Sequence, residues 1–334
     1  MKKMKVIIFG CGVMGRKMAE ALLEKKSLEL VGALDINPQL VGKDLGEFLP
    51  SKKKLGIIIR NDPQALFSRV KAQAVIHTTT SGLANVFPQI AQCLKAKLNV
   101  ISTCEELSYP WKRYPKLSRD LDRLAQKCGA TVVGTGINPG YLMDTLPLIL
   151  TAPCLKVDSI KVTRMMNSAR RRIPFQAKVG TGLTTGEFRE KIDNKIITGH
   201  VGLMESINMI AAGLGWALDE AVEIPPKPVI AKKPVRTGLG IVKPGNVIGL
   251  VSLAYAKKNG KKVIILEFCA NAGVRQEYDE VTIEGLPRIH EKILGGVHGD
   301  VGTVAMTLNT IPRAVEAPAG LKVMKDLPPA TATL

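Results

Sequence analysis

The sequence predicts an α/β Rossmann nucleotide-binding domain followed by an α+β second domain with a mainly antiparallel sheet. Short β-branched runs alternate with helical patterns up to about residue 140. A glycine-rich turn directly follows the first of these runs. Beyond about residue 150, strand patterns recur without regular intervening helices. The expected domains are residues 1–140, residues 141–300, and a C-terminal helix and tail over 301–334 that packs back on the first domain.

Composition limits the possible functions. Of the 334 residues, 46% are hydrophobic, enough for two domains with buried cores. The net charge is +18, but the basic residues are spread along the chain and aromatic residues amount to 4%. We therefore expect a basic surface that attracts an anionic coenzyme or substrate, and no nucleic-acid partner. No apolar run has the length of a membrane span, and no C-x-x-C pair occurs, so we expect a cytoplasmic protein without a metal site.

The first βαβ unit is predicted by a strand over Lys5–Phe9, a helix over Lys17–Lys25 and a strand over Leu28–Leu34. Its crossover must be right-handed. Further alternation predicts the rest of a parallel sheet with helices on both faces. The expected strands are Ile57–Ile59, Ala74–His77, Asn99–Ser102 and Thr131–Gly134, and the expected helices are Pro63–Val70, Val86–Ala96 and Lys116–Lys127. Asp62 is expected to cap the first of these helices and Gly129 to end the last.

A G-x-G-x-x-G motif joins the first strand to the first helix. Gly10 permits the tight turn, Gly12 lets the backbone approach a pyrophosphate, and Gly15 lets helix and strand pack closely. Asp35 ends the second strand and is expected to bind the ribose hydroxyls of NAD. Because Lys43 follows closely, use of NADP stays open. The predicted dinucleotide site comprises Gly10, Gly12, Val13, Met14, Gly15 and Asp35.

Polar loops follow the later parallel strands, where open α/β sheets bind ligands. The first of these loops contains Thr78, Thr79 and Thr80. Their hydroxyls either hold the nicotinamide ribose or diphosphate, or cap the next helix. His77, before that loop, is expected to be packed rather than catalytic. In a later loop, Asn138 is expected to bind the nicotinamide carboxamide, with a plain turn as the alternative. The coenzyme contacts expected from these loops are Thr78, Thr79, Thr80, Ser102, Thr103, Asn138 and Pro139.

Two adjacent carboxylates, Glu105 and Glu106, follow the strand Asn99–Ser102. Neighbouring residues in an extended segment face opposite ways, so one of them is expected to enter the cleft. A glutamate in a partly desolvated cleft has a raised pKa and can act as a general base. The alternative is a pair of acids in the first turn of the following helix.

The second half of the chain offers cationic groups for a substrate carboxylate. Strands are expected over Val157–Met165 and Val263–Cys269, helices over Val201–Ala217 and Val301–Thr310, and a connection over Pro225–Pro234. A glycine-rich turn precedes the last helix, either bringing His298 to the cleft or placing Asp300 as the N-cap. The predicted substrate residues are Tyr141, Arg164, Asn167, Arg170 and His298.

Three stretches carry a family resemblance: S-T-C-E-E-L from Ser102, G-T-G-I-N-P-G-Y-L-M-D-T-L-P from Gly134, and G-G-V-H-G-D from Gly295. With I-P-R-A-V-E-A-P-A-G-L from Ile311, they resemble 2,4-diaminopentanoate dehydrogenases and related amine dehydrogenases, which share the dihydrodipicolinate reductase-like architecture. The paired histidines and the K-x-x-x-x-x-S-G-T pattern of dihydrodipicolinate reductase itself are absent from the sequence.

The resemblance implies reversible oxidative deamination of a small amine or diamino acid to a ketone with release of ammonia. It implies a cleft glutamate as acid/base, which falls on Glu105 or Glu106, with Glu105 preferred. An imine or carbonyl reductase, with Tyr141 as the nearby proton donor, and a non-catalytic NAD-binding sensor are the alternatives. A homodimer through the sheet of the second domain is expected from the fold.

Overall fold

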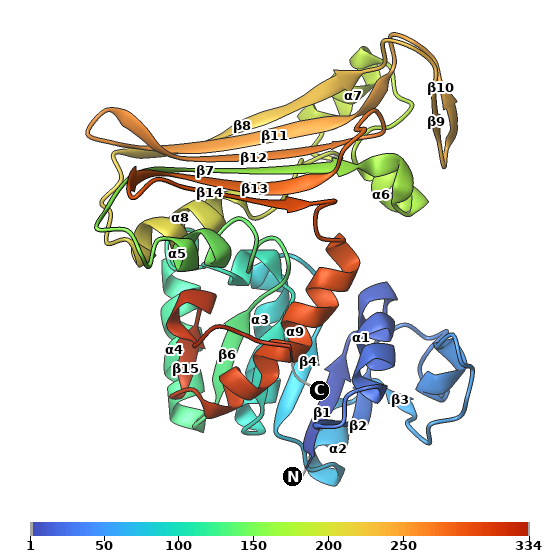
Figure 1. Cartoon of the computed structure of the whole chain (residues 1–334). Helices are drawn as coiled ribbons and strands as arrows, with labels where there is room; N and C mark the ends of the chain where they lie inside the picture. Colours follow the sequence, from blue (N-terminus) through green and yellow to red (C-terminus); the bar gives the residue numbers. More distant parts are fainter. Residues whose placement is uncertain (1–2, 333–334) are drawn as a thin grey trace. The chain divides into compact units, whose positions relative to one another are not determined.

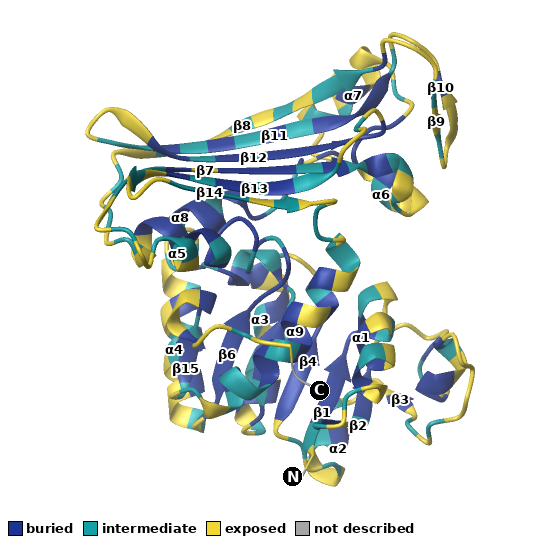
Figure 2. Ribbon diagram, viewed as in Figure 1, coloured by how far each residue is buried: buried dark blue, intermediate teal, exposed yellow. Residues whose placement is uncertain are grey.

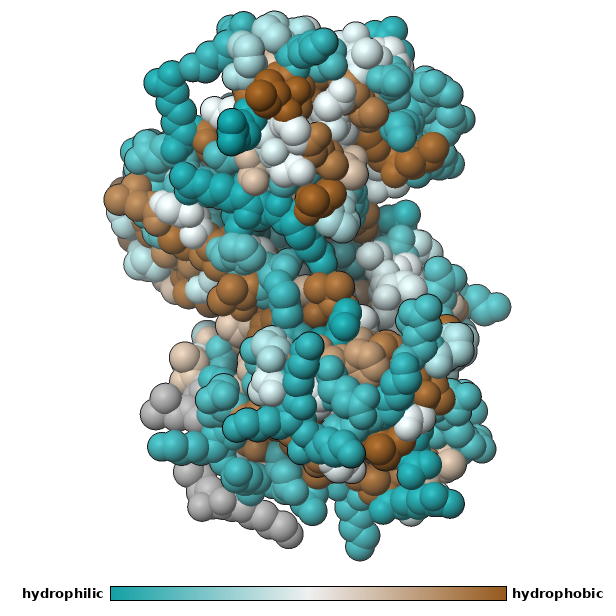
Figure 3. Space-filling model, turned by 90° about the vertical axis from the view of Figure 1, so that its right-hand side faces the viewer, coloured by the Kyte–Doolittle hydropathy of each residue, from teal (hydrophilic) through white to brown (hydrophobic). Residues whose placement is uncertain are grey.

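In the computed structural model, residues 3–332 are described, and they form two compact units (Figure 1). The first unit contains the chain up to Tyr141 and again from Gly299 onward; the second is Leu142–His298. No helix within residues 3–332 is both long and apolar enough to cross a membrane. On the face seen in Figure 3, hydrophilic side chains cover most of the surface and hydrophobic ones form small separate groups.

A seven-stranded parallel sheet forms the centre of the first unit, in the order β15-β6-β5-β4-β1-β2-β3. The predicted Rossmann-like parallel sheet is confirmed. The order reverses between β1 and β4, which is the position where such sheets bind ligands. The strands are β1 (Met4–Phe9), β2 (Leu28–Leu34), β3 (Ile59–Arg60), β4 (Ala74–His77), β5 (Asn99–Ser102), β6 (Thr131–Gly134) and β15 (Gly320–Lys322).

Local signals set the helices of this unit. The Asp62 carboxylate accepts a hydrogen bond from Ala65 N with Pro63 in the first turn, and Gly129 ends its helix in the left-handed conformation at φ 67°. The first helix begins at Val13, four residues earlier than predicted, directly after Gly12. The helices are α1 (Val13–Leu23), α2 (Pro63–Arg69), α3 (Leu83–Lys95), α4 (Pro115–Cys128) and α9 (Gly299–Glu316), with short 3-10 turns η1 (Leu45–Phe48), η2 (Glu105–Leu107) and η4 (Met324–Asp326).

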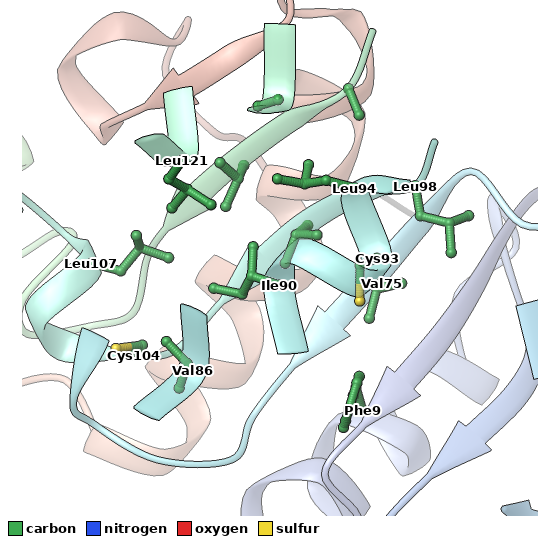
Figure 4. Packing of buried hydrophobic residues seen from close by; sticks show 14 of the residues in the cluster. Phe9, Val75, Val86, Ile90, Cys93, Leu94, Leu98, Cys104, Leu107 and Leu121 are labelled. Atoms are coloured by element: carbon green, nitrogen blue, oxygen red, sulfur yellow. The ribbon is translucent and has the colours of Figure 1, made fainter. Parts of the chain in front are cut away.

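The core of the first unit is aliphatic. Helices α3 and α4 pack against each other, α3 over β5 and β6 and α4 over β6 and β15. Ile90 and Leu121 both belong to the buried cluster of this layer (Figure 4). Strands β1, β4, β5 and β6 are almost wholly buried, as Figure 2 shows. A rigid parallel sheet therefore fixes the loops that follow its strands.

The second unit is built on a six-stranded sheet in the order β14-β13-β7-β12-β11-β8. Only β7 and β12 run parallel; the other neighbours are antiparallel, so the predicted mainly antiparallel sheet is confirmed. The strands are β7 (Lys156–Asn167), β8 (Glu220–Ile230), β11 (Val247–Lys258), β12 (Lys261–Asn271), β13 (Tyr278–Leu286) and β14 (Ile289–Leu294), and a separate hairpin pairs β9 (Val235–Thr237) with β10 (Gly240–Val242).

Two expectations for this unit are wrong. Sequence alone predicts a connection over Pro225–Pro234, but its first six residues, 225–230, belong to strand β8, which lies at the sheet edge beside β11. An edge strand tolerates proline because the missing N–H faces away from the ladder. The expectation that strands recur without regular intervening helices is also wrong. The helices are α5 (Thr145–Leu150), α6 (Ile173–Lys178), η3 (Ser168–Arg170), α7 (Thr185–Asp193) and α8 (Leu203–Gly213). Of these, α6 and α7 lie between β7 and β8 in addition to α8, the predicted helix within 201–217.

The two faces of this sheet differ. One face, here called the inner face, packs against α8 and against a cluster around Phe188 and Phe268. Side chains of opposite parity form the outer face, where Leu253, Tyr255 and Ile265 are half-buried. Along one row of the inner face, Ser252, Phe268, Arg164 and Asp279 follow one another on neighbouring strands. Buried polar groups thus interrupt an otherwise apolar surface.

Candidate active site

The glycine motif makes the turn that its spacing predicts. Gly10 has φ 105°, and a Cβ there would lie 2.5 Å from the carbonyl oxygen of Thr78. A Cβ at Gly15 would overlap the carbonyl oxygen of Gly10. At Gly12 a Cβ would meet nothing within 4 Å, so the space in front of the α1 N-terminus is open to a ligand. The first amides of α1, beginning with Val13 and Met14, have no side-chain cap and suit a diphosphate.

Asp35 is fixed at the end of β2. Its Oδ2 accepts a hydrogen bond of 2.6 Å from Cys11 N, and its Oδ1 accepts one of 2.8 Å from Asn37 N. Beside it lies a cavity of about 220 Å³, far larger than one water requires. Its lining residues are Phe9, Leu34, Asp35, Ile36, Arg60, Asn61, Pro63, Gln89 and Gln92. A pocket with apolar walls and a carboxylate at its rim fits the adenosine part of a dinucleotide.

Most of these cavity residues were missed by sequence reasoning. Arg60 ends the two-residue strand β3 and Asn61 follows it. Gln89 and Gln92 lie one turn apart on α3. The position of Arg60 directly after an expected strand was a usable signal, because ligands gather at the carboxyl ends of parallel strands. Nothing in the sequence singles out the two glutamines.

The loop after β4 does not cap the next helix with its hydroxyls. Thr78 Oγ1 donates to the carbonyl oxygen of Gly10 at 2.9 Å, and Thr79 Oγ1 donates to Gln89 Oε1 at 2.8 Å. Thr80 is exposed. Helix α3 begins after Gly82 without a cap from its own loop. The helix-cap alternative for this loop is therefore wrong.

The two candidate acids in η2 differ in their surroundings. Glu106 Oε2 accepts from Leu83 N at 2.8 Å, and its Oε1 lies 3.2 Å from Arg113 Nη2, so it caps α3. Glu105 is half-buried, and within residues 3–332 no hydrogen bond or ion pair engages its carboxylate. The geometry therefore leaves Glu105 as the carboxylate available for chemistry.

The loops after β5 and β6 lie against each other. Thr135 N donates to the carbonyl oxygen of Ser102 at 2.8 Å, and a Cβ at Gly134 would lie 2.5 Å from the carbonyl carbon of Leu107. Asn138 and Pro139 follow, half-buried and buried respectively. Thr103 is half-buried beside Ser102. The expected coenzyme contacts of this region are thus brought together at one edge of the sheet.

Arg164 lies deep in the second unit. Its guanidinium Nε is 3.4 Å from Asp279 Oδ1, and its Nη2 donates to the carbonyl oxygen of Val297 at 2.6 Å. Burial lowers the pKa of Arg164 and raises that of Asp279, against the mutual attraction of the pair. Asp279 Oδ2 also accepts from Val297 N at 2.7 Å, which fixes the backbone immediately before the exposed His298.

The other expected substrate residues have structural partners. Asn167 accepts from Ala169 N and donates to the carbonyl oxygen of Val274. Arg170 is exposed and lies 3.4 Å from Glu277, whereas the more buried Arg171 approaches the same carboxylate at 2.9 Å. Their roles as substrate ligands stay a prediction. Tyr141 is half-buried at the end of the first unit.

His200 was not anticipated from the sequence. Its ring stacks on Phe268 with a centroid distance of 4.4 Å, and its Nε2 is buried without a hydrogen-bond partner among the described residues. Burial, with the charges of Arg164 and Lys178, lowers the pKa of His200 to about 3. A buried polar atom without a partner is costly, so this nitrogen fits a ligand group. A histidine in a loop between helices carries no sequence signal for this role.

Within residues 3–332, no group of three or more His, Cys, Asp or Glu side chains is arranged to hold a metal ion.

Comparison with known proteins gives consistent results along the chain. Residues 141–334 match the family model of the 2,4-diaminopentanoate dehydrogenase C-terminal domain, and residues 4–104 match the N-terminal domain of dihydrodipicolinate reductase. The chain is 34% identical to 2,4-diaminopentanoate dehydrogenase of Acetoanaerobium sticklandii, over 98% of this chain and 94% of that protein. It is 23% identical to an amine dehydrogenase of Streptomyces virginiae, over 96% of this chain and 95% of the relative. The structure of an amine dehydrogenase from Mycobacterium smegmatis superposes with a TM-score of 0.84 at 25% identity, over 99% of this chain and 97% of that one.

Proposed function

Because the chain belongs to the 2,4-diaminopentanoate dehydrogenase family, we propose that it catalyses reversible oxidative deamination with a nicotinamide coenzyme. An amine, water and NAD(P)+ give a ketone, ammonia, NAD(P)H and a proton, and the reverse reaction aminates the ketone. The observation that carries this proposal is the half-buried Glu105 carboxylate, which has no hydrogen-bond or ion-pair partner among residues 3–332, beside the loops of a dinucleotide-type fold. The substrate class is a small amine or diamino acid resembling 2,4-diaminopentanoate.

The coenzyme is NAD in preference to NADP. Asp35 is held by two backbone amides with its charge at the rim of the adenosine cavity, where a 2′-phosphate would be repelled. The exposed Arg60 lines the same cavity and moderates this repulsion. The proposed coenzyme contacts are Gly10, Gly12, Val13, Met14, Gly15, Asp35, Thr78, Thr79, Thr80, Ser102, Thr103, Asn138 and Pro139.

Glu105 is the proposed acid/base. The bound coenzyme supplies a hydride acceptor at its nicotinamide ring. Glu105 takes a proton from the substrate ammonium, so that the neutral amine can lose hydride from its carbon. The resulting substrate iminium is cationic, and the carboxylate stabilises it electrostatically. Glu105 releases this first proton to solvent and then takes a proton from the water that attacks the iminium carbon. It passes that proton to the nitrogen of the resulting carbinolamine, and it takes up the hydroxyl proton as the C–N bond breaks and ammonia and the ketone are released.

The substrate carboxylate of a diamino acid is proposed to bind the second unit. Arg164 has a buried guanidinium, and His200 has a buried ring nitrogen. Burial and the charge of Arg164 both lower the pKa of His200. Arginine suits a carboxylate because its planar donors bind both oxygens. Tyr141, Asn167, Arg170 and His298 complete the proposed substrate residues.

The quaternary state is proposed to be a homodimer through the outer face of the second-unit sheet. On that face, half-buried apolar side chains lie among charges of both signs, such as Lys161 with Glu267 and Lys292 with Glu280. A twofold axis places the same patch on both subunits, so mixed charges can pair with their opposites. Light scattering should give twice the chain mass, and Leu253→Lys should give the monomer.

All described cysteines are free thiols, which supports a cytoplasmic location.

The function is tested by incubating the protein with NAD+ and 2,4-diaminopentanoate or simple 2-aminoalkanes at alkaline pH and recording NADH. Glu105→Gln should abolish turnover while NADH still binds, and Glu106→Gln should retain turnover with reduced stability. Full turnover in Glu105→Gln would exclude its role as the base. A carbonyl or imine reductase would use NADH without ammonia, and a sensor would bind NADH and turn over none of these amines.

A further inference from the structure

A series of hydrogen-bonded polar side chains crosses the interior of the first unit. It runs from the cavity beside Asp35, here called the adenosine cavity, to the residues Thr103, Cys104 and Glu105 after β5, here called the Glu105 loop. His77 is fully buried, and its Nε2 lies 2.8 Å from Gln89 Oε1 while its Nδ1 lies 3.0 Å from Ser102 Oγ. Thr79 Oγ1 joins the chain with hydrogen bonds to Gln89 Oε1 at 2.8 Å and to His77 Nε2 at 3.2 Å. The members come from β4, β5, the loop after β4, and α3.

The direction of these hydrogen bonds follows from the partners. Gln89 Oε1 can only accept, so the ring proton of His77 is on Nε2. Nδ1 of His77 then accepts from the hydroxyl of Ser102, which leaves the Ser102 oxygen free to accept from Cys104 N at 3.1 Å. Burial lowers the pKa of His77 to about 4, so the ring stays neutral and this arrangement persists at physiological pH.

At one end of this series of hydrogen-bonded side chains, Ser102 holds the loop that carries Glu105. Cys104 N donates to Ser102 Oγ at 3.1 Å, and Cys104 Sγ donates to the carbonyl oxygen of Ser81 at 3.0 Å. Thr103 N donates to the carbonyl oxygen of His77 at 3.0 Å, so His77 holds this loop through its backbone and its ring. A displacement of Ser102 therefore changes the position of the residues before Glu105.

At the other end of this series of hydrogen-bonded side chains, Gln89 borders the adenosine cavity. Gln89 lines that cavity and, through the same side chain, accepts from Thr79 and His77. A ligand that packs against Gln89 restricts its side chain, and each restricted member fixes the next because hydrogen-bond networks act cooperatively. Gln92 lines the same cavity one turn further along α3, but no such hydrogen bond joins it to the chain of polar side chains among the described residues.

We propose that Gln89 and His77 are positioning residues that couple filling of the adenosine cavity to ordering of the Glu105 loop. The inference rests on the proposed function, because it takes the cavity beside Asp35 as the adenosine site. Binding of the adenosine half then organises the acid/base before the nicotinamide half is in place. The coupling needs no change of backbone fold, only restriction of four side chains.

The test uses 5′-AMP, which fills the adenosine cavity without a nicotinamide. Calorimetry measures AMP binding, and hydrogen–deuterium exchange measures the Thr103, Cys104 and Glu106 amides. In the full-length protein, saturating AMP should slow exchange of these amides by about tenfold, a usual size for coupling between sites. Gln89→Met, which keeps the length of the side chain, should bind AMP and lose the slowing.

Gln92→Met is the matched control, because it alters the same cavity but not the polar chain. At its own saturating AMP it should keep the tenfold slowing. His77→Gln tests the middle of the chain if Gln89→Met is poorly folded. Equal slowing in wild type and Gln89→Met, or AMP binding without slowing in wild type, would overturn the coupling alone. Absence of AMP binding in wild type would overturn the coupling together with the adenosine assignment.

Discussion

Arg164 and Asp279 face each other on neighbouring strands and bind opposite ends of one residue, Val297. The guanidinium binds its carbonyl oxygen at 2.6 Å, and the carboxylate binds its N–H at 2.7 Å. Their own separation is 3.4 Å between Nε and Oδ1. A buried ion pair adds little net stability, but it fixes the groups that it contacts. Here it fixes the backbone that leads to His298 while keeping a cation on the inner face.

Removing one partner of this pair should be costly. Asp279→Asn leaves the Arg164 charge buried without its counter-ion, and we expect the free energy of unfolding of the second unit to fall by about 3 kcal/mol. The second unit contains Trp216, so denaturation by urea can be recorded by its fluorescence in a Trp111→Phe background. The double variant Arg164→Met with Asp279→Leu should be more stable than either single change. A loss in Asp279→Asn below about 0.5 kcal/mol would contradict the pairing.

His77 gives the protein a stability that depends on pH. Its folded pKa of about 4 lies below the value of ~6.5 for an unfolded chain. The stability is therefore complete above pH 6.5, and it is lost as the pH falls towards 4. In this window His77 should contribute a slope of about 1.4 kcal/mol per pH unit. Denaturation of wild type and His77→Asn, followed by Trp111 fluorescence in a Trp216→Phe background, should differ by that slope. Parallel pH profiles would show that the ring is not buried neutral.

Much of the first unit was predictable because its signals are local. Strands β2, β4, β5 and β6 have the predicted bounds, because each is a short and mostly apolar run that ends at or directly before a polar residue or a glycine. Strand β15 was missed because three residues, Gly320–Lys322, carry no pattern. It is held by a distant contact, in which Leu321 N donates to Asp122 Oδ1 at 2.8 Å.

The second unit and the cavity depended on long-range packing. Helix α5 has six residues and α7 has nine, too short for a helical period to be distinguished. Asp35 was identified by its distance from the glycines. Gln89 was not identified, because its role comes from α3 packing beside β4. The sequence makes both Glu105 and Glu106 candidates for the acid/base. The structure distinguishes them, because the Glu106 carboxylate accepts a hydrogen bond from the Leu83 amide.

Coenzyme preference should respond to the charge of Asp35. Asp35→Asn keeps an oxygen for one backbone amide but removes the charge, so the ratio of kcat/KM for NAD+ to that for NADP+ should fall on the order of tenfold, or about 1.4 kcal/mol. Initial rates with both coenzymes at a fixed amine concentration give the ratio. Arg60→Gln should move it the other way, because a cation near a 2′-phosphate is lost. An unchanged ratio in Asp35→Asn would mean that the ribose does not lie against this carboxylate.

The glycines of the turn should separate folding from coenzyme binding. A Cβ at Gly15 overlaps the Gly10 carbonyl oxygen, so Gly15→Ala should cost about 1–3 kcal/mol of stability through overpacking. At Gly12 the space is open and the φ of −65° is ordinary, so Gly12→Ala should cost under about 1 kcal/mol. Its methyl group projects where the diphosphate is proposed to lie, and the Kd for NADH should therefore rise by tenfold or more, about 1.4 kcal/mol. Thermal unfolding and NADH fluorescence titration of the two variants measure both effects. Normal NADH affinity in a stable Gly12→Ala would place the diphosphate elsewhere, since no protein atom competes for that space.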